Sequence, residues 1–404
     1  MTLIECFTES HIDNVAASLR LRPDKLILVG DAREMEIPVR RYRKLLQERG
    51  FSTEVSTCGV QKKDIGQIRS VLTELLKKGG DFVIDLTGGD ELVIMAVGGV
   101  LALMDDRTRG SVRVEKYDYG TDAVVDCTAG NRVIPYKPVD LTVRELIELH
   151  GGSLHPTSYQ PPREYTSRDI AGLWQVVSEE PKEWNRTIIL LNQFEGRNQS
   201  KSETRITVPL KLLRGVADFE KKEQSVRRLL ERLDRNGVIQ DRSSRDVLDY
   251  TYTSALLRYC TRKAGNVLEV KTLLEGRETA PFFTDCMMSV SIDWDGVPHS
   301  PVEQESDTRN EIDVVLMRGM IPLFISCKNG DIGEDELYKL HTVAERFGGP
   351  RAKKMLVATD LDRKSPKADQ AFVQRAWDMD VYPATEAGKL SDREWSQILK
   401  DATR

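Results

Sequence analysis

Short apolar runs alternate with helical patterns through the first third of the chain. The runs at residues 3–7, 25–29, 51–57 and 81–86 are strand-like, and a segment with helical periodicity follows each of them. Strands that are apolar on both faces are typical of a parallel sheet that helices cover on its two sides. The pattern therefore predicts an α/β, Rossmann-like domain whose ligand site lies at the carboxyl ends of the strands.

The predicted first domain spans residues 1–152. Near its end, residues 112–119 and 123–127 are predicted to form a pair of strands, and 143–149 a short helix. The stretch 153–165 contains three prolines and follows two glycines, which makes it the best linker candidate.

A middle segment, residues 153–250, is predicted to be this linker followed by a helical connector. Helical periodicity covers 167–177 and 216–236, and a short strand is predicted at 238–239. A helix, a glycine, a short strand and a polar loop in this order would suit a winged-helix unit. Many helical connectors share the same order, so the sequence leaves both interpretations open.

The last segment, residues 251–404, is predicted to form a second α/β domain. One long helix is expected over 253–274, interrupted only by Gly265. Further elements are strands at 282–292, 311–317 and 322–327, a helix at 334–347 and a strand at 354–358.

Composition narrows the classes of function. The 404 residues include 59 lysines and arginines against 64 acidic residues, a net charge of −5. Proteins that clamp long duplexes through phosphates carry a positive excess, so contact with nucleic acid would need local basic patches or a metal site. Six scattered cysteines without a Cys-x-x-Cys pair argue against a zinc cluster or a disulfide framework. Without a signal peptide or a long apolar segment, we expect a cytoplasmic protein with no membrane association.

A glycine-containing loop follows the last strand of the predicted parallel sheet. In Thr87-Gly88-Gly89, glycines would let backbone N–H groups approach a ligand, and the helix that follows adds its partial positive charge. Thr8 and Ser10, after the first strand, are expected at the same edge of the sheet. The alternative is a tight strand-to-helix turn with capping residues. The loop matches neither the dinucleotide fingerprint nor a Walker loop.

Charged residues alternate with apolar ones in two consecutive strands of the second domain. Glu311 and Asp313 share one face of the first strand, and Ser326 and Lys328 share one face of the second. If residues 318–321 form the turn, Asp313 lies opposite Ser326. Carboxylates bind Mg²⁺ or Mn²⁺, which activates water, and a lysine stabilises the charge that develops on a phosphate.

The alternative is an amphipathic hairpin with a solvated charged face. It is weakened because Lys328 ends an otherwise apolar strand. Glu269 is a third candidate carboxylate, one helical turn after Gly265, which would let the helix pass close to the sheet.

At these residues the chain resembles CRISPR-associated proteins that join a CARF sensor domain to a PD-(D/E)xK nuclease domain. The shared signatures are Leu-Thr-Gly-Gly after a sensor strand, Gly-x-x-Leu-Glu on a helix, Asn-Glu-Ile-Asp-Val, and Ile-Ser-Cys-Lys. They occur in the family's order and extend over nearly the whole chain. The last two together are fairly specific, whereas the glycine loop alone is not.

The resemblance implies a homodimer that binds cyclic oligoadenylate, usually cyclic tetra-adenylate, made by type III CRISPR complexes. It implies an endonuclease that uses Mn²⁺ or Mg²⁺ to cut single-stranded RNA or DNA, or to nick duplex DNA such as a plasmid. By position, Asp313 would be the main metal ligand, Glu269 the helix carboxylate and Lys328 the catalytic lysine. Thr87, Gly88 and Gly89 would line the phosphate face of the ring.

Two departures from the family pattern leave alternatives open. Ser326 stands where the wider superfamily has an acidic residue, so Glu269 or Glu311 would have to supply a carboxylate. Asp90 stands where many CARF domains have a hydroxyl residue, and we expect it to cap the helix instead. The main alternative is a cyclic oligoadenylate-responsive DNA-binding regulator with a vestigial nuclease fold. A further one is a ring nuclease that degrades its own activator.

Overall fold

The computed structural model describes residues 1–61, 63–121, 123–155, 159–213, 215, 217–294, 309–330, 332–361 and 365–404. Two compact units share the chain. The first is formed mainly by Met1–Leu154, and the second mainly by His155–Ile292, Arg309–Glu345 and Ala352–Arg404. None of the described helices is both long enough and apolar enough to cross a lipid bilayer.

A seven-stranded sheet forms the centre of the first unit, with the strand order β3-β2-β1-β4-β5-β6-β7. The strands β3, β2, β1, β4 and β5 are parallel, and β6 and β7 continue the sheet antiparallel. The predicted strand pair is the antiparallel pair β5–β6, whereas β7 was not predicted. The strands are β1 Thr2–Cys6, β2 Lys25–Gly30, β3 Glu54–Gly59, β4 Phe82–Asp85, β5 Val112–Asp118, β6 Ala123–Asp126 and β7 Arg132–Ile134.

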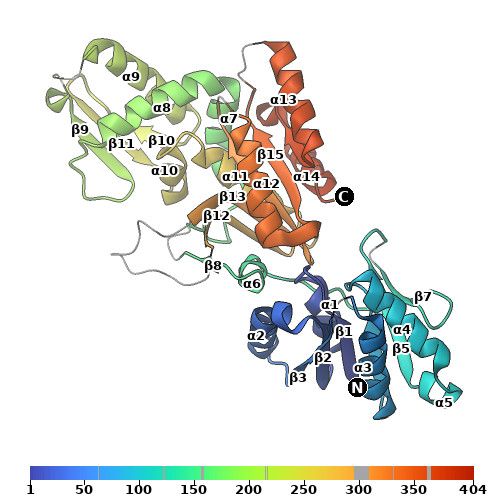
Figure 1. The fold of residues 1–404 in the computed structure, drawn as a ribbon. Helices are drawn as coiled ribbons and strands as arrows, with labels where there is room; N and C mark the ends of the chain where they lie inside the picture. The colour runs from blue at the N-terminus through green and yellow to red at the C-terminus, as the bar shows by residue number, and fades with distance from the viewer. Residues whose placement is uncertain are drawn as a thin grey trace. The chain divides into compact units, whose positions relative to one another are not determined.

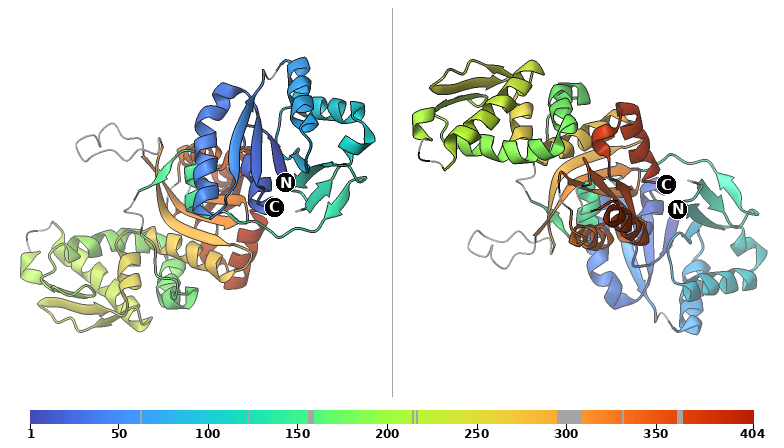
Figure 2. Two further views of the ribbon diagram at one scale, coloured as in Figure 1. Left: turned by 90° about the horizontal axis from the view of Figure 1, so that it is seen from below. Right: turned by 90° about the horizontal axis from the view of Figure 1, so that it is seen from above.

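Helices cover both faces of this sheet (Figure 2, left). Alternate strand residues, such as Ile4, Ile27 and Ile84, are buried with α3 and α4 in one apolar core. On the opposite face α1 and α2 are joined by a hydrogen bond from Asn14 to the Tyr42 hydroxyl. The helices are α1 Asp13–Leu21, α2 Ala32–Glu48, α3 Ile65–Lys77, α4 Glu91–Leu103, α5 Asp106–Arg109 and α6 Val143–Leu149.

The second unit begins with helices that pack on a small antiparallel sheet of order β10-β11-β9. The helix, glycine and short strand predicted near residue 237 are present as the end of α9, Gly237 and β10. α8, β9 and β11 were not predicted. The elements are α7 Ala171–Glu179, α8 Pro181–Glu195, β9 Arg205–Pro209, α9 Phe219–Arg235, β10 Ile239–Asp241 and β11 Val247–Tyr252.

A larger sheet follows, in which β16, β15, β14, β13 and β12 lie side by side in that order. Figure 1 labels β12, β13 and β15 of this sheet. β13 and β14 form an antiparallel hairpin, and β14, β15 and β16 are parallel. The strands are β12 Asp285–Asp293, β13 Arg309–Arg318, β14 Ile321–Lys328, β15 Lys353–Ala358 and β16 Val381–Ala384. The helices are α10 Ala255–Thr261, α11 Asn266–Glu278, α12 Asp335–Gly348, α13 Pro366–Asp378 and α14 Asp392–Asp401.

The prediction of one long helix over 253–274 is wrong in one respect. The segment forms two helices, α10 and α11, which are separated at residues 262–265. Gly265 precedes α11 and makes no close approach to the sheet. That role belongs to Gly276, where an added Cβ would lie 2.8 Å from a methyl carbon of Leu316 on β13.

Candidate functional site

The β13–β14 hairpin brings the predicted polar residues together. Arg318 pairs with Ile321 across a two-residue turn, and Val314 pairs with Ile325. The register predicted from the sequence is confirmed at its functional end, because the Ser326 hydroxyl donates to an Asp313 carboxylate oxygen over 3.2 Å.

The Asp313 carboxylate is held from three directions. The same oxygen that receives the Ser326 hydroxyl also accepts the backbone N–H of Cys327 at 2.6 Å. Lys328 Nζ lies 3.6 Å from it. Burial raises the pKa of Asp313 above its ordinary value, although Lys328 and both hydrogen bonds act in the opposite direction. Ser326 therefore orients the carboxylate.

Lys328 has a second carboxylate partner that the sequence did not reveal. Its Nζ lies 3.0 Å from Glu336 on α12. Burial lowers the pKa of Lys328, but the negative charges of Asp313 and Glu336 outweigh burial and raise it overall. Glu336 had no signal of its own, because a glutamate in the first turn of a helix usually serves the helix dipole.

Glu269, near the start of α11, completes the site. Its pKa is raised to about 8, first by burial and then by the charges of Asp313 and Glu311. Glu311 is exposed on β13. The structure thus places three predicted carboxylates and Lys328 within one electrostatically coupled group, because the charge of Lys328 also acts on Glu269.

The donor chemistry of this group fits a hard divalent cation. Repulsion among the carboxylates would be relieved by a cation, and carboxylate oxygens are the ligands that Mg²⁺ and Mn²⁺ prefer. Among the described residues, no three His, Cys, Asp or Glu side chains already converge at metal-binding spacing. Asp313 and Glu269 therefore stay the predicted ligands.

In the first unit, the predicted loop residues meet at the carboxyl ends of β1 and β4. An added Cβ at Gly88 would lie 2.5 Å from the Thr8 methyl carbon. Gly89 has a φ of +104°, and a Cβ there would lie 2.8 Å from Cys6. Both glycines are required for this close approach of the loops. Ser10, which follows β1, is buried.

The Thr87 hydroxyl is already occupied. It donates to Asp85 at 2.6 Å and accepts the backbone N–H of Tyr117 at 2.9 Å. No described residue accepts the backbone N–H of Gly88 or Gly89, so these groups can receive an anion. The predicted cap is confirmed, since the Asp90 carboxylate accepts the N–H of Leu92 at 2.9 Å.

A row of buried carboxylates lies beneath this loop and was not predicted. Glu5, Asp85 and Glu115 occupy the same level of three adjacent strands. Each is at most 1% exposed, and Arg20 forms an ion pair with Glu115. Burial raises the pKa of Asp85 to about 6. The row holds Asp85 under Thr87 and so fixes the loop.

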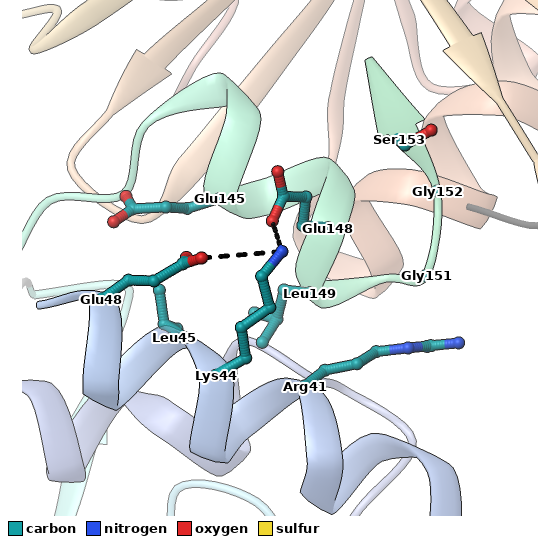
Figure 3. Close-up of a pocket in the computed structure, with 10 residues that line it drawn as sticks. All are labelled: Arg41, Lys44, Leu45, Glu48, Glu145, Glu148, Leu149, Gly151, Gly152 and Ser153. Carbon is teal, nitrogen blue, oxygen red and sulfur yellow. Dashed lines mark hydrogen bonds and ion pairs between the residues drawn. The ribbon is translucent and has the colours of Figure 1, made fainter. Parts of the chain in front are cut away.

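A cavity of about 260 Å³ lies between α2 and α6 of the first unit (Figure 3). Lys44 of α2 lies 2.5 Å from Glu148 of α6 and 3.7 Å from Glu48 of its own helix. Its lining includes none of the predicted site residues, and the Lys44–Glu148 ion pair joins the two helices.

Two solved structures share the fold over the whole chain. Protein VC1899 from Vibrio cholerae matches 99% of this chain and 97% of its own with a TM-score of 0.72 and 16% identity. Can2 from Sulfobacillus thermosulfidooxidans, solved in complex with cyclic tetra-adenylate, matches 100% of this chain and 97% of its own with a TM-score of 0.67 and 16% identity. The chain matches no protein-family model and no curated protein sequence. The likeness confirms the predicted α/β fold class, and it shows that the chain shares the fold of Can2 over its whole length. That the first unit is a CARF domain and the second a restriction-endonuclease-like domain stays a prediction.

Proposed function

We propose that this protein is a cyclic oligoadenylate-activated, metal-dependent endonuclease of type III CRISPR defence. The observation that carries the proposal is the coupled group of Asp313, Glu269 and Lys328 on a hairpin and helix of the second unit. The likeness to Can2, a protein solved with cyclic tetra-adenylate, supports this ring as the activator. Substrates would be single-stranded RNA or DNA and plasmid duplexes.

The residues of the site would divide the chemistry between them. Asp313 and Glu269 would hold Mn²⁺ or Mg²⁺, which when bound polarises the phosphodiester and makes water a better nucleophile. Lys328, kept protonated by Asp313 and Glu336, would stabilise the negative charge that develops on the phosphate. Ser326 and the Cys327 N–H would keep the Asp313 carboxylate aimed into the site.

The first unit would be the sensor of a homodimer. The N–H groups of Gly88 and Gly89, which no described residue accepts, precede α4 and would receive phosphates of the ring. Thr87 would act by fixing the loop, because its hydroxyl already bonds Asp85 and the Tyr117 N–H. Activation requires that the ring bind the active arrangement better than the resting one.

The alternative, a DNA-binding regulator, is less well supported. It would need a basic helix free to contact DNA, and the candidate in the sequence is the pair Arg227-Arg228 of α9. Arg228 makes only a 3.4 Å hydrogen bond to the Ser225 hydroxyl of the same helix among the contacts of the described residues. Arg227 bonds Glu223 at 2.7 Å and donates to the backbone carbonyls of Ser244 and Arg245. Its guanidinium therefore fixes the loop before β11 within the fold.

The test compares two lysines that both contact Glu336. Lys328 Nζ lies 3.0 Å from Glu336, and Lys339, 61% exposed, lies 3.2 Å from it. We expect Lys328→Ala to lower ring-activated cleavage by at least about 100-fold while ring binding is unchanged, since a preorganised charge contributes on this scale. Lys339→Ala should cut as the parent does. Equal activity of Lys328→Ala and the parent would refute the assignment.

A further inference from the structure

The break between α10 and α11 is held in a fixed position. The carbonyl of Ala264 accepts Trp184 Nε1 at 3.0 Å and Asn329 Nδ2 at 3.2 Å. Asn266 donates to the carbonyl of Tyr259 at 2.9 Å. Asn329 directly follows the lysine of the candidate site, so this short segment is tied to the end of β14.

Two exposed cations stand on this segment. Arg262 and Lys263 are both exposed, and within the part of the chain that the structure describes neither forms an ion pair. The charge of Lys263 acts on Glu269, and that of Arg262 acts on the Tyr159 hydroxyl. In a chain with a net charge of −5, this is a local positive patch beside the candidate nuclease site.

A pair of stacked tyrosines adjoins the two cations. The rings of Tyr159 and Tyr259 have centroids 3.8 Å apart and planes inclined by 21°. Both side chains are partly exposed and rest on the apolar core of the second unit. Aromatic faces next to basic side chains are the usual means by which proteins bind unpaired nucleotides.

Polar atoms connect the tyrosine pair to the site. The hydroxyls of Tyr259 and Ser289 are 3.5 Å apart, and the Ser289 hydroxyl lies 3.5 Å from a Glu269 carboxylate oxygen. Ser289 has a φ of +47° within β12, a conformation that is unfavourable for serine and persists only where its surroundings determine it. A pair of rings that only covered the core would need neither this connection nor the two adjacent cations.

We propose that Tyr159, Tyr259, Arg262 and Lys263 form a subsite for an unpaired nucleotide next to the phosphodiester that is cut. The base extends the tyrosine stack, and the two cations hold the neighbouring phosphates. Paired bases inside a duplex are not available for such stacking, so the subsite favours single strands. The inference rests on the proposed nuclease function and adds to it the residues that would select single strands over duplexes.

The test measures binding by fluorescence anisotropy of the full chain with cyclic tetra-adenylate and EDTA. The probes are a labelled oligothymidylate and a labelled duplex of equal length. We expect Tyr159→Leu to weaken single-strand binding by about 5- to 50-fold, as for other stacking residues, and to change duplex binding less than about twofold. Tyr159→Phe, which keeps the ring, should bind as the parent. Trp377→Leu, at an aromatic that is 48% exposed on α13, is the matched control.

A second test changes exposed charged side chains, whose removal does not disturb the packing of the core. We expect the exposed double variant Arg262→Gln, Lys263→Gln to reduce the salt dependence of single-strand binding by a slope of about 1.4, roughly 0.7 for each lost contact. Lys367→Gln, at an exposed lysine of α13, should leave the slope unchanged. An unchanged slope in the double variant, or equal losses for single strand and duplex in Tyr159→Leu, would overturn the subsite.

Cleavage by the same preparations separates this inference from the nuclease assignment. If the parent cuts with Mn²⁺ and Tyr159→Leu cuts single strands with the parent's KM, the subsite is wrong and the nuclease stands. If the parent never cuts but single-strand binding still depends on Tyr159, the nuclease assignment is wrong and the four residues stand as a binding site for an unpaired nucleotide. The expected result is a raised KM with kcat nearly unchanged.

Discussion

Replacing Glu269 with glutamine should stabilise the protein and abolish its activity. The Glu269 carboxylate is largely buried next to Asp313 and Glu311, and these effects raise its pKa from 4.5 to about 8. Above that pH the folded protein holds an ionised carboxylate where burial and repulsion disfavour it. Glutamine keeps the shape and removes the charge.

The size of the stabilisation follows from the shift in pKa. In the unfolded chain Glu269 ionises near pH 4.5, whereas in the folded chain it keeps its proton to about pH 8. Unfolding therefore releases a proton in this window, and stability falls as the pH rises through it. At about 1.4 kcal/mol per pKa unit the upper limit is roughly 5 kcal/mol. Because the side chain is partly exposed to solvent, we expect about 1–3 kcal/mol.

The assay is urea unfolding of the second unit at pH 5.0 and pH 8.5. We expect Glu269→Gln and the parent to unfold at nearly the same urea concentration at pH 5.0. At pH 8.5 the variant should need more urea, while its ring-activated cleavage is lost. Glu231→Gln, at an exposed glutamate of α9, should change neither property. The reasoning is refuted if Glu269→Gln is no more stable than the parent at pH 8.5.

Three further changes test separate parts of the account. Ser326→Ala should lower cleavage only about 3- to 10-fold, because Asp313 loses one hydrogen bond with a net value of about 1 kcal/mol and keeps the 2.6 Å bond from the Cys327 N–H. A loss of activity as large as that of Lys328→Ala would contradict an orienting role for Ser326. Gly88→Ala should destabilise the first unit by about 1–3 kcal/mol, because the added methyl group overpacks the contact with Thr8. The same change should weaken the binding of cyclic tetra-adenylate, measured by calorimetry. Unchanged binding would mean that the ring binds elsewhere. Glu336→Gln should lower the pH above which cleavage is lost, because the Glu336 carboxylate helps to raise the pKa of Lys328. An unchanged upper limit in the pH–rate profile would contradict this coupling.

The parts of the fold that could be predicted are those in which one local signal sufficed. The parallel strands of the first unit are apolar runs, and a strand that is apolar on both faces has to lie in a sheet that helices cover on both sides. The register of Asp313 against Ser326 followed from the period of two and a short turn. The break between α10 and α11 could not be predicted, because it depends on Trp184 and Asn329, which bind Ala264 from distant parts of the chain.

In the candidate site, too, residues with a local sequence signal could be predicted and residues brought together by the tertiary fold could not. Lys328 was recognisable because a lysine ended an apolar strand, but Glu336 is one of two acidic residues in the first turn of α12, and nothing local distinguishes it from Asp335. The Tyr159–Tyr259 stack joins residues one hundred positions apart, and neither has a local pattern that marks it. The buried row of Glu5, Asp85 and Glu115 becomes visible only when β1, β4 and β5 are placed side by side. Tertiary pairing creates these groups, so periodicity alone does not reveal them.

The most direct test of the central claim is cleavage of a fluorescent single-stranded RNA and a supercoiled plasmid with Mn²⁺, with and without cyclic tetra-adenylate. We predict cutting that requires both the metal and the ring and that disappears in Asp313→Ala, while that variant still binds the ring. Absence of cutting by the parent under every condition, with the ring bound, would contradict the nuclease and favour the regulator.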